Sequence, residues 1–209
     1  MHIITVQHTE AVHHKNGMVG GSADWPLTKR GEWQARRIAK ALRRELGAKP
    51  DYVLYASDML RTTQTAAPIS RALGLPIQYV PELREIKVGS AAGQSKAWLK
   101  EHQAPREGVP FLDYRPLPDA ETWREMSGRV ARFTERLEAA GENAIVVAHG
   151  GSLGCFVQCF LQVPKDHSEH IWFHGSAGGV HRLEKQLVEN GRALYILHKF
   201  NEIPFERRP

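Results

Sequence analysis

Short apolar runs alternate along this chain with segments of helical periodicity, and this alternation constrains the fold more than any other feature. The runs are mostly continuous and rich in β-branched residues, as expected of strands that are buried on both faces. The predicted strands cover residues 3–6, 52–56, 76–80, 144–148, 179–183 and 193–200. Strands joined by helices predict an α/β fold, a three-layer αβα sandwich whose mostly parallel central sheet carries helices on both faces.

The predicted helices carry signals at their ends. Thr28 is a typical N-cap residue, and Gly47 and Pro50 close the helix that follows it. Thr122 and Glu125 form a capping-box pattern before a later helix. Further helices are predicted to begin at Ser57-Asp58 and end near Gly74, to surround Trp98, and to follow His149-Gly150-Gly151.

The length and composition predict one domain over residues 1–209, because no linker-like stretch divides the chain. No apolar run is long enough to span a membrane, and the amino terminus lacks the pattern of a signal peptide. We therefore expect a cytoplasmic protein without a membrane partner. Cys155 and Cys159 lie four residues apart in one predicted helix and are expected to be reduced thiols. The sequence leaves the oligomeric state open, with a homodimer as one option.

The net charge of +5 is compatible with an anionic substrate but does not select one. Basic residues cluster at Arg36-Arg37, Arg43-Arg44 and Arg207-Arg208, mostly on predicted helix faces, where solvated charge is ordinary. A nucleic-acid surface would need a basic stripe interleaved with aromatic residues, and the sequence has none. We expect no nucleic-acid partner.

His8 is the first functional candidate, because it directly follows the apolar run of residues 3–6. Open α/β sheets bind their ligands at the carboxyl ends of the strands. Together with His8, His13 and His14 in the following loop could suggest a metal site. No carboxylate or cysteine sits at a spacing that completes a familiar ligand set, so neither a metal nor another cofactor is expected.

Six segments in chain order carry the strongest functional signal. They are Gln7-His8-Thr9-Glu10, Asp24-Trp25-Pro26-Leu27-Thr28 with Gly31 and Gln34-Ala35, residues 57–66, Leu83-Arg84-Glu85 with Gly89 and Gly93, Ala120-Glu121-Thr122, and Ala148-His149-Gly150-Gly151. Together they resemble the signatures of the histidine phosphatase superfamily, which includes cofactor-dependent phosphoglycerate mutases and many small phosphatases. The resemblance covers nearly the whole chain and implies the phosphoglycerate mutase-like fold.

The resemblance implies a role for each of four residues. His8 would be the nucleophile that forms a phosphohistidine, and Arg61 would hold the phosphate with its planar guanidinium. His149 would donate to the phosphoryl oxygens, and Glu85 would protonate the leaving alkoxide and later activate water. Phosphoryl transfer asks a protein mainly for such positioning and charge. Further phosphate contacts are expected from Gln7, Thr9, His14, Asn16, Gly21 and Gly150.

The sequence departs from the family pattern around the nucleophile. Gln7 stands where the family has arginine, and this change removes a charge-assisted hydrogen bond, which is roughly twice as strong as a neutral one. Thr9 replaces a glycine. His14 occupies a usual asparagine position, with Asn16 nearby as a substitute.

One hypothesis is that another cation restores the missing charge. The candidates are a protonated His13 or His14, or Arg84, which all lie in segments expected near the phosphate. This hypothesis predicts an activity optimum at lower pH than an arginine-equipped site would show.

The function expected from these residues is that of a phosphomonoester phosphatase acting on a small phosphorylated metabolite. By resemblance, the mutases of the family are longer between the segments equivalent to Glu85 and Thr122 and at the carboxyl end, which keeps water out. Here both parts are short, and this favours hydrolysis. Two alternatives stay open: a phosphoglycerate mutase-type phosphotransferase, and a phosphate-binding protein whose turnover is impaired by Gln7.

Substrate specificity is expected to reside in the loops covering residues 9–23 and 105–121. Five aromatic residues are candidates for lining the site, although core packing is the more frequent role of each: Trp25, Trp98, Phe111, Tyr114 and Trp172.

Overall fold

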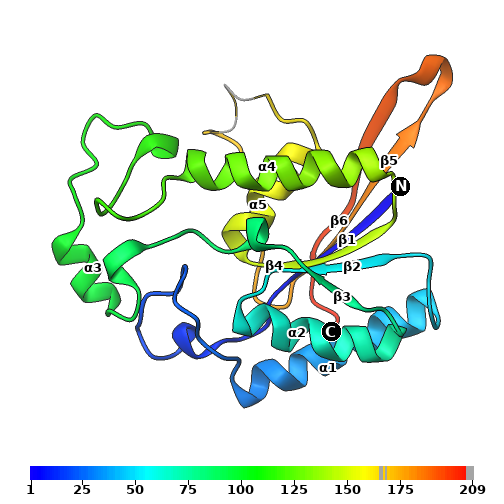
Figure 1. The fold of residues 1–209 in the computed structure, drawn as a ribbon, viewed down its shortest axis with the longest axis horizontal. Coiled ribbons are helices and arrows are strands. Elements are labelled where there is room, and N and C mark those ends of the chain that lie inside the picture. The colour runs from blue at the N-terminus through cyan, green and yellow to red at the C-terminus, as the bar shows by residue number, and fades with distance from the viewer. Residues whose placement is uncertain (165–166, 168, 206–209) are drawn as a thin grey trace.

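The computed structural model describes residues 1–164, 167 and 169–205, so the basic pair Arg207-Arg208 lies outside the described residues. The described strands form one six-stranded sheet in the order β3-β2-β4-β1-β5-β6 (Figure 1). Strands β1 to β4 pair in parallel, and β5 and β6 are antiparallel additions at one edge. The strands are β1 (His2–Gln7), β2 (Val53–Ala56), β3 (Ile77–Tyr79), β4 (Ala144–Ala148), β5 (Val180–Leu187) and β6 (Ala193–Glu202).

Helices cover both faces of this sheet, which confirms the predicted three-layer sandwich (Figure 1). Helices α1 and α2 lie on one face and α4 and α5 on the other, whereas α3 lies among the loops beyond the carboxyl ends of the parallel strands. No helix in the described part of the chain is both long and apolar enough to cross a membrane. The helices are α1 (Lys29–Leu46), α2 (Leu60–Leu73), α3 (Lys96–His102), α4 (Trp123–Ala140) and α5 (Gly150–Phe160), and short 3₁₀ turns cover Val12–His14, Pro81–Leu83, Gly89–Ala91, Phe111–Asp113 and Glu189–Gly191.

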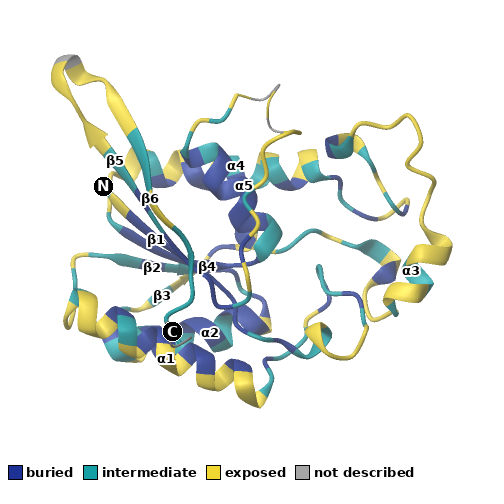
Figure 2. Ribbon diagram, turned by 180° about the vertical axis from the view of Figure 1, so that it is seen from behind, coloured by how far each residue is buried: buried dark blue, intermediate teal, exposed yellow. Residues whose placement is uncertain are grey.

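Alternate residues of the central strands build two separate cores. In β4, Ala144 and Val146 pack with the apolar faces of α4 and α5, while Ile145 and Val147 pack with those of α1 and α2. Figure 2 shows these strands buried between the helical layers. Burial on both faces explains why the run is continuously apolar and why its limits, 144–148, were predicted correctly.

Helix α2 begins later than predicted. Ser57-Asp58 has the composition of an N-cap, but the helix starts at Leu60, because both side chains are held by other elements. The Leu60 N–H instead donates to Oδ1 of Asp24, at 2.7 Å. A carboxylate from the loop after β1 therefore caps this helix, and no local pattern reveals that cap.

The chain after His8 is fastened to the start of α1. Ala11 and Leu27 form an isolated bridge, so the intervening loop is closed at its base. A Cβ atom on Gly31 would lie 2.0 Å from the carbonyl oxygen of Glu10, a distance that no side chain permits. Glycine at this position therefore allows α1 to approach the end of β1, which positions the loop beside the nucleophile candidate.

We expect Gly31→Ala to lower the free energy of unfolding by about 1–3 kcal/mol, the usual cost of overpacking. The added methyl would meet a backbone carbonyl, which cannot move without displacing the end of β1. Gly128→Ala on the exposed face of α4 is the matched control, because nothing lies within 4 Å of its Cβ position. This control should gain about 0.5–1 kcal/mol of stability from helix propensity. Urea unfolding followed by circular dichroism measures both variants, and equal stabilities would contradict the packing argument.

Candidate active site

A cavity of about 640 Å³ lies at the carboxyl ends of β1 and β4, beside the amino terminus of α5. The fully buried His149 lies next to it, with its ring centre 5.3 Å from that of His8. The structure thus brings together residues from five separated segments of the chain. The predicted site residues that line the cavity are Gln7, His8, His14, Gly21, Arg61, Glu85 and Gly150.

His8 directly follows β1, and its backbone N–H donates to the carbonyl of Ala148 on the neighbouring strand at 2.9 Å. Its Nδ1 lies 2.8 Å from the carbonyl oxygen of Thr9. Because a carbonyl only accepts, Nδ1 carries the proton and Nε2 keeps its lone pair. Burial, followed by the nearby Arg61 charge, lowers the pKa of His8 well below its usual value. His8 is therefore a neutral imidazole whose Nε2 is unprotonated and accepts from Nε of Arg61.

Arg61 projects from the first turn of α2 and is almost completely buried. Its Nε lies 3.3 Å from Nε2 of His8, and its two terminal nitrogens donate to the carbonyls of Ala23 and Gly21 at 2.9 and 2.7 Å. Burial lowers the pKa of Arg61 to about 10, so the guanidinium stays charged at neutral pH. No carboxylate of the described chain forms a salt bridge with it. The positive charge is left for an anionic ligand.

His149 occupies the N-cap position of α5, directly after β4. Its Nε2 lies 2.9 Å from the hydroxyl oxygen of Ser57, while its buried Nδ1 has no hydrogen-bond partner among the described residues. Burial and the charge of Arg61 lower its pKa well below the usual value. An orphan nitrogen in a buried ring is costly unless a ligand satisfies it. No local pattern predicts the contact between Ser57 and His149, which joins two strand ends that are distant along the chain.

Glu85 faces the same cavity from the loop after β3. Its two carboxylate oxygens accept hydrogen bonds from the backbone N–H groups of Ile86 and Gly151, at 3.0 and 2.9 Å. A Cβ atom on Gly151 would lie 2.4 Å from Oε1 of Glu85, so glycine leaves the room that the carboxylate needs. The carboxylate is thereby fixed at the amino terminus of α5.

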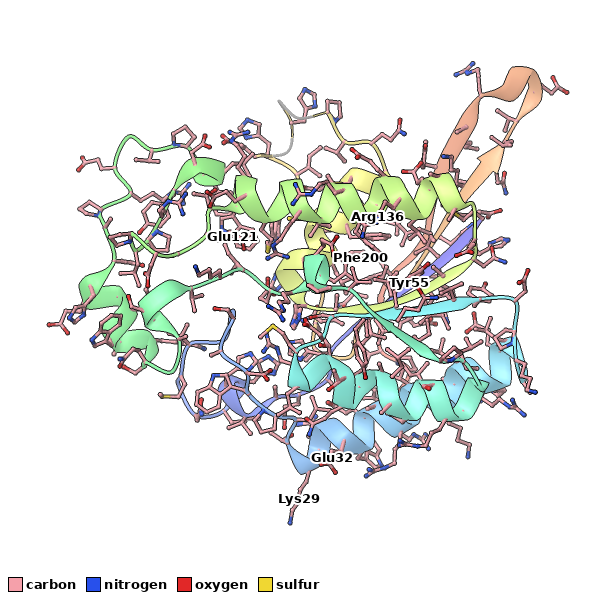
Figure 3. All side chains as sticks on the ribbon, in the orientation of Figure 1. Lys29, Glu32, Tyr55, Glu121, Arg136 and Phe200 are labelled. Atoms are coloured by element: carbon pink, nitrogen blue, oxygen red, sulfur yellow. The ribbon has the colours of Figure 1, made fainter. Side chains whose placement is uncertain are left out.

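Arg129 holds the loop that carries Glu85. No sequence pattern identified this arginine as part of the site. Its guanidinium donates to the carbonyl oxygens of Glu82, Arg84 and Glu85 at 2.6 to 3.1 Å. It also forms a two-point pair with Glu121, which lies just before α4 (Figure 3). Because both partners of this pair are mostly buried, it orders the loop more firmly than a surface ion pair would.

Gln7 lines the cavity with a side chain that is only 9% exposed and forms no hydrogen bond with the described residues. Its Nε2 lies 3.2 Å from the Cβ position of Gly150, at the start of α5. A nearly buried amide without a partner is a donor available to an oxygen of a ligand. Gln7 therefore offers a neutral contact at the position where the family has a charged one.

Two predicted phosphate contacts do not reach the cavity. The Thr9 hydroxyl donates to the carbonyl of Gly31 at 2.8 Å, so this side chain packs toward α1 and has a structural role. Asn16 is exposed, and its Oδ1 accepts from the backbone N–H of Met18 at 3.0 Å. The prediction that these side chains contact phosphate is corrected accordingly.

The candidates for restoring the missing charge do not supply it in this structure. Burial, followed by the neighbouring His14 and Arg61, lowers the pKa of His13 to about 3, and burial also lowers the pKa of His14. Arg84 is engaged with Asp58, at 2.7 Å between Nε and Oδ1, and does not line this cavity. Both imidazoles are neutral near pH 7, so neither supplies the charge there, and the activity optimum at lower pH stays a prediction.

The three imidazoles are close enough to be considered as metal ligands. Within the described residues, His8, His13 and His14 each offer a ring nitrogen within 4.8 Å of the others. However, the guanidinium of Arg61 lies against His8, and like charges repel. The Nδ1 atom of His14 also accepts from the backbone N–H of Ala11 at 3.2 Å. The electrostatics of the group favour an anion over a metal cation.

Aromatic side chains also line this cavity. Of the five aromatic candidates, Phe111 and Trp172 line it, as does Trp123 in the first turn of α4. The remaining candidates have other partners. The Trp25 indole donates to Val19, Trp98 stacks on His102, and the Tyr114 hydroxyl donates to Ala104.

Comparisons with known proteins agree with this geometry. A model of the histidine phosphatase superfamily (branch 1) matches residues 3–187. A probable phosphoglycerate mutase GpmB of Enterobacter sp. (strain 638) is 33% identical over 174 residues, which cover 78% of this chain and 76% of that protein. The corresponding protein of Yersinia enterocolitica is 31% identical over 179 residues, which cover 81% and 78% of the two chains.

Two phosphatase structures share the fold. The α-ribazole phosphatase of Shigella flexneri aligns with a TM-score of 0.80 at 22% identity, over 100% of both chains. A mycobacterial glucosyl-3-phosphoglycerate phosphatase in complex with inorganic phosphate aligns with a TM-score of 0.79 at 18% identity, over 97% of this chain and 98% of that one. At these identities the similarity concerns the fold.

The lowered pKa values of His8, His13 and His149 predict that the protein loses stability in mild acid. The histidine pKa in an unfolded chain is about 6.5. Between pH 7 and 5 the unfolded state therefore binds more protons, and the free energy of unfolding decreases as the pH falls. Each fully buried, neutral histidine contributes up to about 1.4 kcal/mol per pH unit below pH 6, and the partly exposed His13 contributes less.

Urea unfolding at pH 7, 6 and 5 in phosphate-free buffer measures this dependence. His13→Gln removes one titrating group, so its curve should be flatter than that of the parent protein. A free energy of unfolding that stays constant or rises toward pH 5 would contradict the assignment of neutral imidazoles.

Proposed function

The chain belongs to the histidine phosphatase superfamily (branch 1), and from this premise we propose that it is a phosphomonoester phosphatase acting through a phosphohistidine on His8. One observation carries the proposal. A neutral imidazole whose unprotonated Nε2 accepts from Nε of the buried Arg61 faces the cavity, and the carboxylate of Glu85 lines the same cavity. Binding alone would not require a carboxylate at this place, whereas cleavage of an ester does.

In the first step, Nε2 of His8 attacks phosphorus and the bond to the ester oxygen breaks. Glu85 in its acid form gives its proton to the departing alkoxide, which leaves as an alcohol. Positive charge develops on the His8 ring, and the Thr9 carbonyl that accepts from Nδ1 stabilises it. Arg61, the Gln7 amide and the amino terminus of α5 surround the phosphoryl oxygens.

In the second step, water replaces the alcohol. Glu85, now a carboxylate, accepts a proton from water as the water oxygen attacks phosphorus, and the bond from phosphorus to Nε2 breaks. Inorganic phosphate leaves, and His8 returns to its neutral form. We infer that the substrate is a small phosphorylated metabolite, because the cavity is a pocket of about 640 Å³ and not an extended basic surface.

A mutase is the second candidate. It is supported by sequence similarity to two proteins that are named probable phosphoglycerate mutases. A mutase returns the phosphoryl group to an acceptor, whereas a phosphatase gives it to water. Phosphorus NMR of the protein with 3-phosphoglycerate and a bisphosphorylated donor distinguishes them. We expect inorganic phosphate to accumulate, and formation of 2-phosphoglycerate without loss of phosphate would favour the mutase.

We expect His8→Ala to lower phosphate release by at least about 1000-fold, because the covalent intermediate cannot form. Release of inorganic phosphate from a panel of phosphomonoesters measures the effect, with His102→Ala on the exposed face of α3 as the matched control. Rapid quenching should trap an acid-labile phosphohistidine in the parent protein. Undiminished turnover by His8→Ala would overturn the mechanism. A parent protein that binds vanadate but hydrolyses nothing would favour a binding function.

Gln7→Arg tests the cost of the departure from the family pattern. A charge-assisted hydrogen bond contributes about 1.5–3 kcal/mol and a neutral one about 0.5–1.5 kcal/mol. The variant should therefore bind inorganic phosphate about 5- to 10-fold more tightly than the parent protein. Calorimetric titration gives the affinity, with Gln7→Met as the variant that should bind more weakly. Unchanged affinity in both variants would show that Gln7 makes no contact with the anion.

A further inference from the structure

We propose that Phe111, Trp123 and Trp172 form a leaving-group subsite, which selects phosphomonoesters whose alcohol carries a flat, uncharged ring. The inference rests on the proposed function, because it names the substrate class of the same cavity. It begins from an observation that phosphate binding does not explain. Three large aromatic side chains that contact one another line the same cavity as His8 and Arg61.

The three rings form a corner. Phe111 and Trp123 are stacked with their centres 5.5 Å apart and an angle of 26° between their planes. Trp172 is nearly perpendicular to both, at 86°, with centre distances of 6.0 and 4.7 Å. This corner offers a face and an edge at once, which is the arrangement that a further aromatic ring prefers. Trp172 is 36% exposed, so it has surface left for a ligand to cover.

The corner lies where the leaving group must be. The edge of the Trp123 ring and Oε1 of Glu85 both approach the Cβ position of Gly151, at 3.1 and 2.4 Å. The carboxylate proposed to protonate the departing oxygen therefore lies beside the aromatic wall. An alcohol that receives this proton would have its carbon skeleton against the rings.

The charges around the corner disfavour a second anionic group on the substrate. One basic side chain, Arg106, lines this end of the cavity, and its guanidinium stacks over Phe111 at 5.1 Å from the ring centre. The acidic Glu169 lines it as well. The lining therefore carries a negative charge as well as a positive one beside these rings, so a carboxylate on the leaving group would lose hydration and also meet a like charge. A neutral ring loses little hydration and gains contact with three rings.

The first experiment compares 2-naphthylmethyl phosphate with ethyl phosphate. Both release primary alcohols of similar acidity, so the comparison reports binding of the ring and not the reactivity of the ester. We expect kcat/KM to be roughly 10- to 100-fold higher for the naphthylmethyl ester, the range given by burial of an aromatic side chain. We also expect 3-phosphoglycerate to be a poorer substrate than the naphthylmethyl ester. Equal kcat/KM values for the two alkyl esters, or a preference for 3-phosphoglycerate, would overturn the proposal.

The variants Phe111→Leu and Trp172→Leu test the wall itself. Each should reduce the ratio of kcat/KM for the naphthylmethyl ester to kcat/KM for ethyl phosphate at least fivefold. Trp33→Leu is the matched control, because this tryptophan is 46% exposed on α1 and does not line the cavity. Thermal melts verify that the variants are folded. A preference that survives both wall substitutions would assign the selectivity to other residues.

Binding of phosphonates separates this proposal from the proposed function. 2-Naphthylmethylphosphonate and ethylphosphonate cannot be hydrolysed at the phosphorus–carbon bond, and their affinities follow from calorimetry and tryptophan fluorescence. If the protein hydrolyses no ester but binds the naphthyl compound at least tenfold more tightly, the phosphatase function fails and the subsite stands. If esters are hydrolysed and the two phosphonates bind equally, the subsite fails and the phosphatase function stands.

Discussion

A buried guanidinium without a carboxylate against it is the constraint on which this site depends. Arg61 is 1% exposed, and its hydrogen-bond partners in the described chain are two backbone carbonyls and the ring of His8. Burying a charge is costly unless it is compensated, and here hydrogen bonds compensate it only in part. The two carbonyls also fix the loop after β1 against α2. Positive potential and loop geometry therefore come from the same side chain, and an anion completes the arrangement.

The other polar groups of the site are neutral donors and acceptors around that single charge. His8, His13, His14 and His149 are uncharged near pH 7, and Gln7 contributes an amide where the family has a second guanidinium. A phosphate dianion would thus be held by one cation together with dipoles. Dipoles that are fixed before the ligand arrives need no reorganisation during the reaction, so geometry partly replaces charge.

The strands and helix starts that depend on local sequence patterns were predicted from the sequence. Runs buried on both faces identified β1 and β4, and the Thr28 and Thr122 caps marked the beginnings of α1 and α4. Contacts between distant segments could not be predicted in this way. The Asp24 cap on α2, the support of the Glu85 loop by Arg129 and the aromatic corner all depend on tertiary structure.

Because the loop after β1 is closed at its base, the position of His8 does not depend on the length of the loop tip. The Ala11–Leu27 bridge and the close contact at Gly31 hold the loop ends, so His8 is positioned without help from the loop tip. The closure entropy of a loop grows only slowly with its length. Insertions at the tip would therefore change the cavity rim at small cost, while the backbone around His8 stays in place. Such modularity lets the shape of the cavity rim evolve through loop length while the strand ends beneath it stay unchanged.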